Sequence, residues 1–236
     1  MRKILLACLV IGLFPFPACA DDGQAVIYWD SAQGQLLRKR IAAEADYWQL
    51  APNFAMQQTQ SYCGVASAVT VLNSLPLKKP VDPAYTPYHY FTQNNFFSPE
   101  VRQVIPAETA LAQGMTREEM AAALARHGAA TRSIPGDTFT DDSLRTLLRT
   151  ALANDGQFVL ANYFRASLDQ VGGGHWSVLA AFDPVSDRVL ILDVAKYKYS
   201  PSWVSIHLLR LAIATLDTTS SKPRGLVLVA MPPSAP

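Results

Sequence analysis

A cysteine at the predicted start of a buried helix is the residue in this sequence best suited to chemistry. Cys63 is followed by Gly64 and by an apolar run over residues 65–72, which ends at Asn73-Ser74-Leu75-Pro76. A thiol in the first turn of a helix faces unpaired backbone N–H groups and the positive end of the helix dipole, and both favour the thiolate. Gln57, which precedes it, can aim its amide N–H at the same point and supply half of an oxyanion hole.

Acyl transfer also needs a base and a group that orients the base. The glycines 172–174 precede an apolar strand over residues 175–182, which is followed by a turn at 183–187 and a second strand over 188–194. In a hairpin built on that turn, His175 and Asp193 fall roughly opposite each other and can hydrogen-bond. The residues therefore predict a triad of Cys63, His175 and Asp193, and the glycines let the backbone approach a substrate closely.

The residues alone leave other interpretations open. A buried and unreactive cysteine is common in proteins. The rival bases are His89, in an aromatic loop, His127, at a predicted helix C-terminus where a cation is ordinary, and His207, within a predicted helix. From side-chain chemistry alone, a working triad and an inert thiol are about equally supported.

The elements that must position these residues follow from periodicity and from helix and turn signals. Prolines exclude long helices and central strands from residues 76–106, so a long ordered loop pinned by aromatic residues is expected there. Thr116-Arg117-Glu118-Glu119 is a capping box, and Gly128 suits the end of its helix. The other predicted elements are strands at 24–29, 157–163 and 225–231 and helices at 34–45, 141–153 and 204–215.

The whole chain limits the interpretation further. Its 236 residues are 50% hydrophobic, which suffices for one sizeable domain. The net charge of +1 favours neither a nucleic-acid partner nor an acidic membrane. We expect a signal peptide at 1–20, a single catalytic domain at 21–231 and a disordered tail at 232–236.

The expected signal peptide has three parts. Arg2 and Lys3 form the charged start, residues 4–14 the apolar centre, and Ala18-Cys19-Ala20 the cleavage site. The apolar run is too short to span a bilayer about 30 Å thick, so an exported, periplasmic or secreted protein without a stable membrane span is expected. A lipid anchor on Cys19 is not expected, because Phe16-Pro17 is a poor match to the usual leucine and small residues. Cleavage would leave Cys63 as the only thiol, so no internal disulfide is expected.

The sequence resembles the phytochelatin synthase family, which belongs to the papain-like cysteine peptidase superfamily. The matching segments run in order through nearly the whole mature chain: Asp46-Tyr47-Trp48, 57–75, 90–97, Gly173-Gly174-His175, Asp193-Val194 with Tyr197-Lys198-Tyr199, and Lys222-Pro223-Arg224-Gly225. The resemblance implies an α+β, papain-like fold, in which an N-terminal helical part with the nucleophile helix packs on an antiparallel sheet that carries the histidine and the aspartate.

The resemblance also implies roles for individual residues. The catalytic residues of the family fall on Cys63, His175 and Asp193, and its oxyanion-hole glutamine falls on Gln57. Papain relatives usually have asparagine as the third member, whereas this chain has aspartate, as phytochelatin synthases do. The γ-glutamyl end of the substrate would be held by Asp217 and Arg224, and Gly174 is a further candidate substrate-binding residue. Asp217 can pair with an ammonium group and Arg224 can grip a carboxylate.

The implied reaction is attack by Cys63 on the Cys–Gly bond of glutathione, followed by hydrolysis or by transfer of γ-Glu-Cys to a second glutathione. The implied partners are glutathione and its metal thiolates, with a homodimer as the candidate assembly. No metal site or cofactor of the chain's own is expected, although activity can depend on cadmium or zinc as glutathione thiolate complexes, in a metal response. Plant members carry a second, cysteine-rich domain linked to metal-dependent synthesis. We expect this chain to lack it and to favour hydrolysis, as short bacterial members are thought to do.

Two other functions remain open. A general papain-like peptidase would cleave ordinary α-peptides and would not need Asp217 or Arg224. A binding protein would capture glutathione or its metal complexes without turnover, and neither function follows from fold alone.

Overall fold

The computed structural model describes residues 26–233. The expected signal peptide at 1–20 and residues 234–236 of the expected tail lie outside the described residues. No helix in the described part of the chain is long and apolar enough to cross a membrane.

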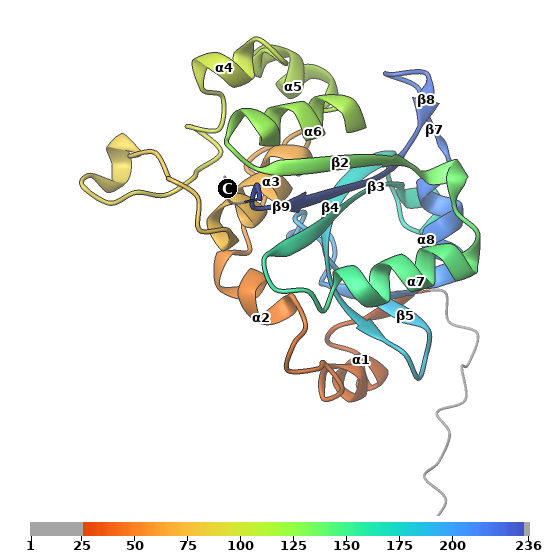
Figure 1. The fold of residues 1–236 in the computed structure, drawn as a ribbon. Helices are drawn as coiled ribbons and strands as arrows, with labels where there is room; N and C mark the ends of the chain where they lie inside the picture. The colour runs from red at the N-terminus through yellow and green to blue at the C-terminus, as the bar shows by residue number, and fades with distance from the viewer. Residues whose placement is uncertain (1–25, 234–236) are drawn as a thin grey trace, which may run out of the picture.

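A seven-stranded antiparallel sheet forms the centre of the molecule, with the strand order β1-β6-β5-β4-β3-β9-β2 (Figure 1). Its strands are β1 (Val26–Tyr28), β2 (Ala130–Pro135), β3 (Gln157–Phe164), β4 (Gly174–Asp183), β5 (Arg188–Leu192), β6 (Ser202–Ser205) and β9 (Gly225–Ala230). A separate two-stranded ribbon pairs β7 (Leu216–Asp217) with β8 (Lys222–Pro223). The α+β architecture that the sequence predicts is confirmed.

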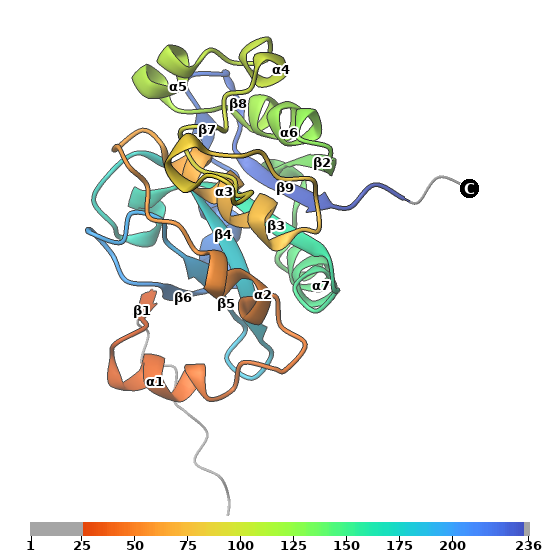
Figure 2. The same cartoon turned by 90° about the vertical axis from the view of Figure 1, so that its left-hand side faces the viewer.

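The helices cover both faces of this sheet. They are α1 (Ala32–Arg38), α2 (Tyr47–Leu50), α3 (Cys63–Ser74), α4 (Pro99–Arg102), α5 (Ala107–Gln113), α6 (Arg117–Arg126), α7 (Asp141–Ala151) and α8 (Ile206–Ile213). The 3-10 turns are η1 (Ala51–Asn53), η2 (Pro83–Tyr85), η3 (Gly136–Thr138) and η4 (Arg165–Leu168). Figures 1 and 2 show α3 against one face of the sheet, with α7 and α8 on the other.

Alternation along the strands divides the core between the two faces. On β3, Phe158 and Leu160 belong to the cluster that packs on α3, whereas Val159 and Ala161 belong to the cluster under α7 and α8. This pattern is expected of a strand buried on both sides. Helix α3 is buried over nearly its whole length, as a central core helix should be. The core therefore fixes the N-terminus of α3 against the sheet.

The structure places the boundaries of two predicted helices at other residues than the sequence periodicity indicates. The helix expected over 34–45 is wrong in its second half, because α1 ends at Arg38 and the chain turns so that Arg40 can pair with Asp183. The helix expected over 204–215 begins only at Ile206, because Val204 pairs with strands on both sides, as part of β6. The edge strand β2 was not predicted.

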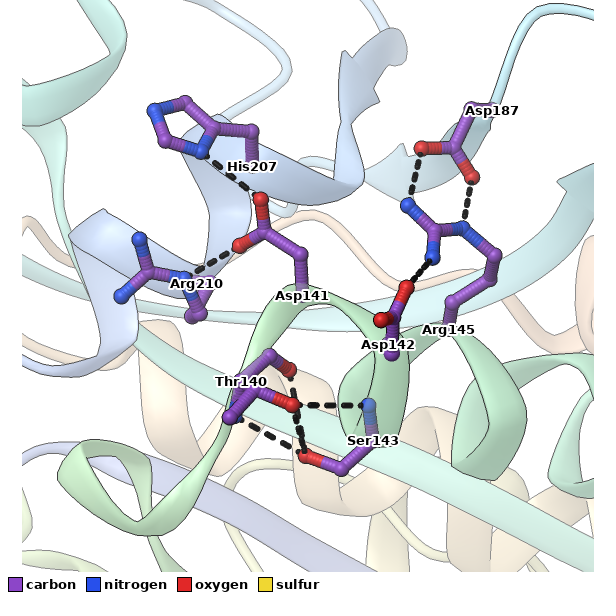
Figure 3. A network of polar contacts seen from close by, with 8 residues as sticks. All are labelled: Thr140, Asp141, Asp142, Ser143, Arg145, Asp187, His207 and Arg210. Atoms are coloured by element: carbon purple, nitrogen blue, oxygen red, sulfur yellow. Dashed lines mark hydrogen bonds and ion pairs between the residues drawn. The ribbon is translucent and has the colours of Figure 1, made fainter.

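A polar network joins α7 to α8 and to the turn between β4 and β5 (Figure 3). The N-cap Thr140 accepts a hydrogen bond from the backbone N–H of Ser143, as a capping residue does. Asp141 pairs with two residues of α8, at 2.9 Å to Nδ1 of His207 and also with Arg210. Arg145 reaches across to Asp187 in the turn between β4 and β5, at 2.7 Å. This network places His207 in the scaffold.

Asp46 provides a prediction about stability. Its side chain is 1% exposed, and neither carboxylate oxygen has a hydrogen-bond partner within the described structure. Burial, with a smaller contribution from the charge of Asp155, raises the pKa of Asp46 to about 8 from its ordinary 3.8. The folded protein therefore holds a proton that the unfolded chain releases, so stability falls as pH rises from about 4 to about 8.

Asp46→Asn removes that proton-linked cost. The variant should gain on the order of 1–3 kcal/mol relative to wild type between pH 4 and pH 8. Chemical denaturation at both pH values measures this difference, and Asp155→Asn should show the same trend more weakly. A difference in unfolding free energy that does not change with pH would contradict the prediction.

Candidate active site

The thiol of Cys63 lies in the first turn of α3, where the sequence predicts it. Cys63 is buried, with 7% of its surface exposed, and Tyr62 occupies the N-cap without making a side-chain cap. The first N–H groups of a helix have no partner inside the helix, so they remain able to bind negative charge. A side chain at position 64 would be crowded, because a Cβ on Gly64 would lie 3.3 Å from Trp176 and 3.1 Å from Met120.

His175 and Asp193 come together at the open end of the β4–β5 hairpin. His175 is the second residue of β4, and Asp193 directly follows β5. The imidazole Nε2–H donates to Oδ1 of Asp193 at 2.9 Å. Nδ1 is then the ring nitrogen left for the thiol, and Cys63 and His175 line the same pocket, close enough for the charge of each to shift the pKa of the other. The structure thus brings the three predicted residues into one chain of contacts.

An irregularity in the hairpin makes this contact possible. Near the turn, Ala181 lies opposite Leu190, but beyond a bulge Leu179 lies opposite Ile191. If the shifted register continues one residue past the end of β5, Asp193 lies opposite Ser177. His175 is then the diagonal neighbour of Asp193 on the same face of the sheet. Without the extra residue the two side chains would emerge on opposite faces, because successive strand residues alternate.

The charges in this chain of contacts support one another. Burial alone would raise the pKa of the Cys63 thiol, but the charge and hydrogen bond of His175 and the backbone of Trp176 and Gly64 outweigh it and lower the pKa. Burial alone would likewise lower the pKa of His175, but the charge of Cys63 and the hydrogen bond to Asp193 raise it. These opposite shifts favour a thiolate–imidazolium pair near neutral pH.

The rate of alkylation tests the state of this thiol directly. Cys63 should react with iodoacetamide at about pH 6 faster than free cysteine does, because only the thiolate attacks and the pKa of free cysteine is near 8.5. Peptide mapping locates the label on Cys63, and unfolding the protein in urea should abolish the difference. Alkylation that follows the ordinary thiol pKa would show that Cys63 and His175 are not paired as ions.

The same thiol lines a pocket with a guanidinium and a carboxylate. This pocket of about 170 Å³ has as its walls Cys63, Gln113, Gly114, Met115, Asn162, Gly174, His175, Trp176, Asp217, Thr218, Thr219 and Arg224. The residues expected to bind the substrate, Gly174, Asp217 and Arg224, are therefore beside Cys63 and His175. The indole N–H of Trp176 donates to the Met115 carbonyl at 2.8 Å and ties the two walls together.

Arg224 is held in place but keeps bonding capacity. Its Nη1 donates to Oδ1 of Asn162 at 2.8 Å, and its Nη2 lies 3.7 Å from Oδ1 of Asp217. Its Nε–H is buried and has no partner within the described structure. Gly174 makes room for it, because a Cβ there would lie 2.2 Å from Nη1. The pair can bind a zwitterion, with Arg224 on its carboxylate and Asp217 on its ammonium group.

Gln57 is fixed beside Asp193 by its own backbone and side chain. Its N–H donates to the Val194 carbonyl at 2.9 Å. Its amide Nε2 donates to the Thr59 carbonyl and to the Tyr197 hydroxyl, both at 2.8 Å. Gln93 clamps the neighbouring backbone, donating to the Met56 carbonyl at 2.8 Å and accepting from the N–H of residue 58 at 2.9 Å. Both amide hydrogens of Gln57 thus have partners within the protein.

The rival histidines take part in other contacts. The imidazole of His127 bonds the Phe96 carbonyl at 2.9 Å, and that of His89 bonds the Lys79 carbonyl at 2.9 Å. His207 is 59% exposed and belongs to the network of α7. Among residues 26–233, no group of three or more His, Cys, Asp or Glu side chains is arranged to hold a metal ion.

Two buried polar residues at this site are not among those that the sequence predicts. Asn162, 1% exposed, orients Arg224, and its polar side chain in the otherwise apolar strand 157–163 was the available signal. Arg165, 3% exposed, pairs with Asp193. Nothing in its local sequence distinguishes Arg165 from a solvated charge at a strand end.

Comparison with known proteins gives a consistent result over most of the chain. The family model described as Phytochelatin synthase matches residues 23–226. Glutathione gamma-glutamylcysteinyltransferase 1 of Triticum aestivum is 31% identical over 213 residues, which cover 87% of this chain and 41% of the relative. The protein of the same name from Arabidopsis thaliana is 27% identical over 216 residues, covering 89% of this chain and 43% of its own length.

A fungal relative matches to a similar degree. Glutathione gamma-glutamylcysteinyltransferase of Schizosaccharomyces pombe is 27% identical over 207 residues, which cover 85% of this chain and 48% of the relative. The chain thus spans less than half the length of each of these curated relatives.

Proposed function

Because this chain belongs to the phytochelatin synthase family, we propose that it is a glutathione γ-glutamylcysteinyl acyltransferase and hydrolase. The observation that carries the proposal is the shared pocket, in which Arg224 and Asp217 lie beside Cys63 and His175. A thiolate–imidazolium pair performs acyl transfer, and the cation and anion beside it suit the zwitterionic end of a γ-glutamyl group.

In the proposed mechanism the Cys63 thiolate attacks the carbonyl carbon of the Cys–Gly bond of glutathione. The imidazolium of His175 gives its proton to the glycine nitrogen as the C–N bond breaks, and glycine leaves. The γ-Glu-Cys acyl group remains on Cys63 as a thioester. His175 then takes a proton from water, which releases γ-Glu-Cys, or from the α-amino group of a second glutathione, which yields phytochelatin.

The remaining site residues have supporting roles in this proposal. Asp193 fixes the tautomer of His175 and stabilises the imidazolium. The backbone N–H of Cys63 and the amide of Gln57 would bind the oxyanion. For Gln57 to do so it must release one hydrogen bond, and Tyr197 is the partner free to move, since 58% of its side chain is exposed.

Mass spectrometry after mixing the protein with glutathione tests the proposal. The expected product is a covalent γ-Glu-Cys adduct on Cys63, with one glycine released for each adduct formed. Protein alkylated beforehand with iodoacetamide is the control and should release no glycine. A mixed disulfide with intact glutathione, or no adduct and no glycine, would favour a binding protein. Cleavage of ordinary peptides that does not depend on Arg224 would favour a general peptidase.

In this proposal metal ions belong to the substrate and not to the protein. Cadmium or zinc would act as thiolate complexes with glutathione, in a metal response, and the chain would bind no cofactor of its own. Product analysis with and without cadmium measures both the metal dependence and the ratio of hydrolysis to transfer. We also propose a homodimer, which light scattering tests.

We propose export as the location of this activity. Its support is the sequence of residues 1–20, with the charged Arg2 and Lys3, the apolar run and the cleavage site. N-terminal sequencing of the protein from a periplasmic extract should begin at Asp21. An intact Met1, or a lipid on Cys19, would contradict the proposal.

A further inference from the structure

Arg165 occupies an unusual position for an arginine outside the substrate pocket. It begins η4 directly after β3 and is 3% exposed. Its Nη2 donates to Oδ1 of Asp193 at 2.9 Å, and its Nη1 lies 2.8 Å from Oδ2 of the same carboxylate. A buried guanidinium needs an anion, because an unpaired charge in the interior is costly. Asp193 is therefore shared between Arg165 and His175.

The atoms of Asp193 define this sharing. Oδ1 accepts three hydrogen bonds, from Nε2 of His175, from Nη2 of Arg165 and from the backbone N–H of Ala195, each at 2.9 Å. Three donors around one oxygen fix the rotation of the carboxylate. Burial alone would raise the pKa of Asp193, but the bonds and charges of His175 and then Arg165 lower it to about 2.

Arg165 is itself fixed by the loop that precedes His175. Its Nη1 donates to Oε1 of Gln170 at 2.7 Å, and its backbone N–H donates to the Gly173 carbonyl at 3.0 Å. Its guanidinium carbon lies 5.0 Å from the centre of the Tyr199 ring. A Cβ at Gly172 would lie 2.9 Å from Cδ of Arg165, so the loop closes directly over the side chain. One arginine thus joins the segments that carry Asp193 and His175.

We propose that Arg165 is a positioning residue of the reaction, which turns Asp193 toward His175 and offsets part of the negative charge that His175 experiences. This inference rests on the proposed acyl transfer. A carboxylate with no other partner would hold the imidazolium more strongly and would make it a poorer acid toward the leaving glycine. Arg165 instead leaves the aspartate ionised and oriented but less able to retain the proton on His175.

Several titratable and charged groups surround this cluster, and the test must take them into account. They are Cys63 of α3, Tyr163 of β3, His175 of β4, Tyr28 of β1, Asp217 of β7, and Asp193, Lys198, Tyr199 and Arg224 of the connecting segments. Removing the positive charge of Arg165 raises the pKa of both the thiol and the imidazolium, because each loses a cation that opposes its proton. Both limbs of a pH profile should therefore move in the same direction.

The pH dependence of Cys63 alkylation tests the proposal without glutathione, so its failure is distinct from failure of the proposed function. The acid limb of the profile is the rise of the alkylation rate with pH as the thiol ionises. Arg165→Met should raise the midpoint of this rise by roughly one pH unit. Arg165→Lys keeps the charge and should leave the limb near that of wild type. Both variants should release glycine from glutathione about 10–100 times more slowly, since neither has the planar fork that orients Asp193.

A matched control separates positioning from stability. Arg40→Met breaks a similar arginine–aspartate pair, with Asp183, at the other end of β4, where Nη2 and Oδ2 are 2.6 Å apart. It should lower the melting temperature without moving the alkylation limb. If Arg165→Met does not fold, Gln170→Met replaces it, because this variant loosens the guanidinium without changing the charge. Gln170→Met should slow glycine release and leave the midpoint of the alkylation profile unchanged. Unchanged profiles and unchanged rates in the folded variants, or an equal shift in Arg40→Met, would overturn the proposal.

Discussion

Replacing His175 by alanine is expected to slow glycine release from glutathione by a factor on the order of 10⁴–10⁶, as much as Cys63→Ala does. The two side chains act as one unit, because each shifts the pKa of the other toward the ion pair. Without the imidazole the thiol loses its charge partner, and the leaving glycine loses its proton donor. The double variant should be no slower than either single variant, since the effects of residues that act as a unit do not add.

Single-turnover measurement of glycine release checks this expectation. His207→Ala is the matched control, because His207 also pairs with an aspartate, Asp141, at 2.9 Å but lies in the network of α7. The control should keep its full rate of glycine release. A His175→Ala variant that stays within tenfold of wild type would remove His175 from the mechanism.

The parts of this fold that could be predicted from the sequence are those set by local patterns. Helix α3 follows from an apolar run, and α6 follows from the capping box, in which Thr116 accepts from the N–H of Glu119. The β4–β5 hairpin follows from two apolar runs around a turn. Each of these signals lies within a dozen or so neighbouring residues, so tertiary contacts are not needed to recognise it.

What the sequence did not predict depends on contacts between distant residues. Val204 became part of β6 because it pairs with Val26 and Val189, although its spacing fits the helix that follows. The bulge between Leu179 and Ala181 shifts the register by one residue, and neither residue type indicates it. The hairpin and the hydrogen bond between His175 and Asp193 were therefore predictable, whereas the bulge that sets their register was not.

The candidate site shows the same division. Residue types and the predicted hairpin indicated Cys63, His175 and Asp193, and the resemblance supported the same three residues. Arg165 and Asn162 had no such signal, because their partners, Asp193 and Arg224, lie 28 and 62 residues away in the sequence. Buried polar pairs of this kind are visible only when both partners are seen in place.

Replacing Arg224 by lysine is expected to lower kcat/KM for glutathione by about 10²–10³, through loss of a fork that can bind a carboxylate with two parallel bonds. Lysine keeps the positive charge near Cys63, so the alkylation rate of the thiol should change little. The loss should therefore appear with glutathione and not with iodoacetamide. Arg224→Met would be a less informative variant, because it also removes a charge that acts on Cys63.

Two further variants show whether the guanidinium acts on the substrate. Gly174→Ala places a Cβ 2.2 Å from Nη1 of Arg224, so it should push the guanidinium aside and lower kcat/KM in the same direction by about tenfold. Arg117→Met is the matched control, since Arg117 is also buried, at 6% exposure, and also has an Nε–H without a partner. Arg117 lines no part of the pocket, so its replacement should reduce stability and leave KM unchanged.

The pattern across the three variants separates the functions that the fold allows. If the guanidinium holds the γ-glutamyl carboxylate, Arg224→Lys and Gly174→Ala lose activity on glutathione, while a peptide without that carboxylate is cleaved equally poorly by wild type and variants. A general peptidase would instead cleave ordinary peptides well, and would do so at the same rate in all three variants as in wild type. Equal kcat/KM for glutathione in wild type and Arg224→Lys would mean that the carboxylate is bound elsewhere, because a lysine ammonium cannot reproduce the two parallel hydrogen bonds of a guanidinium.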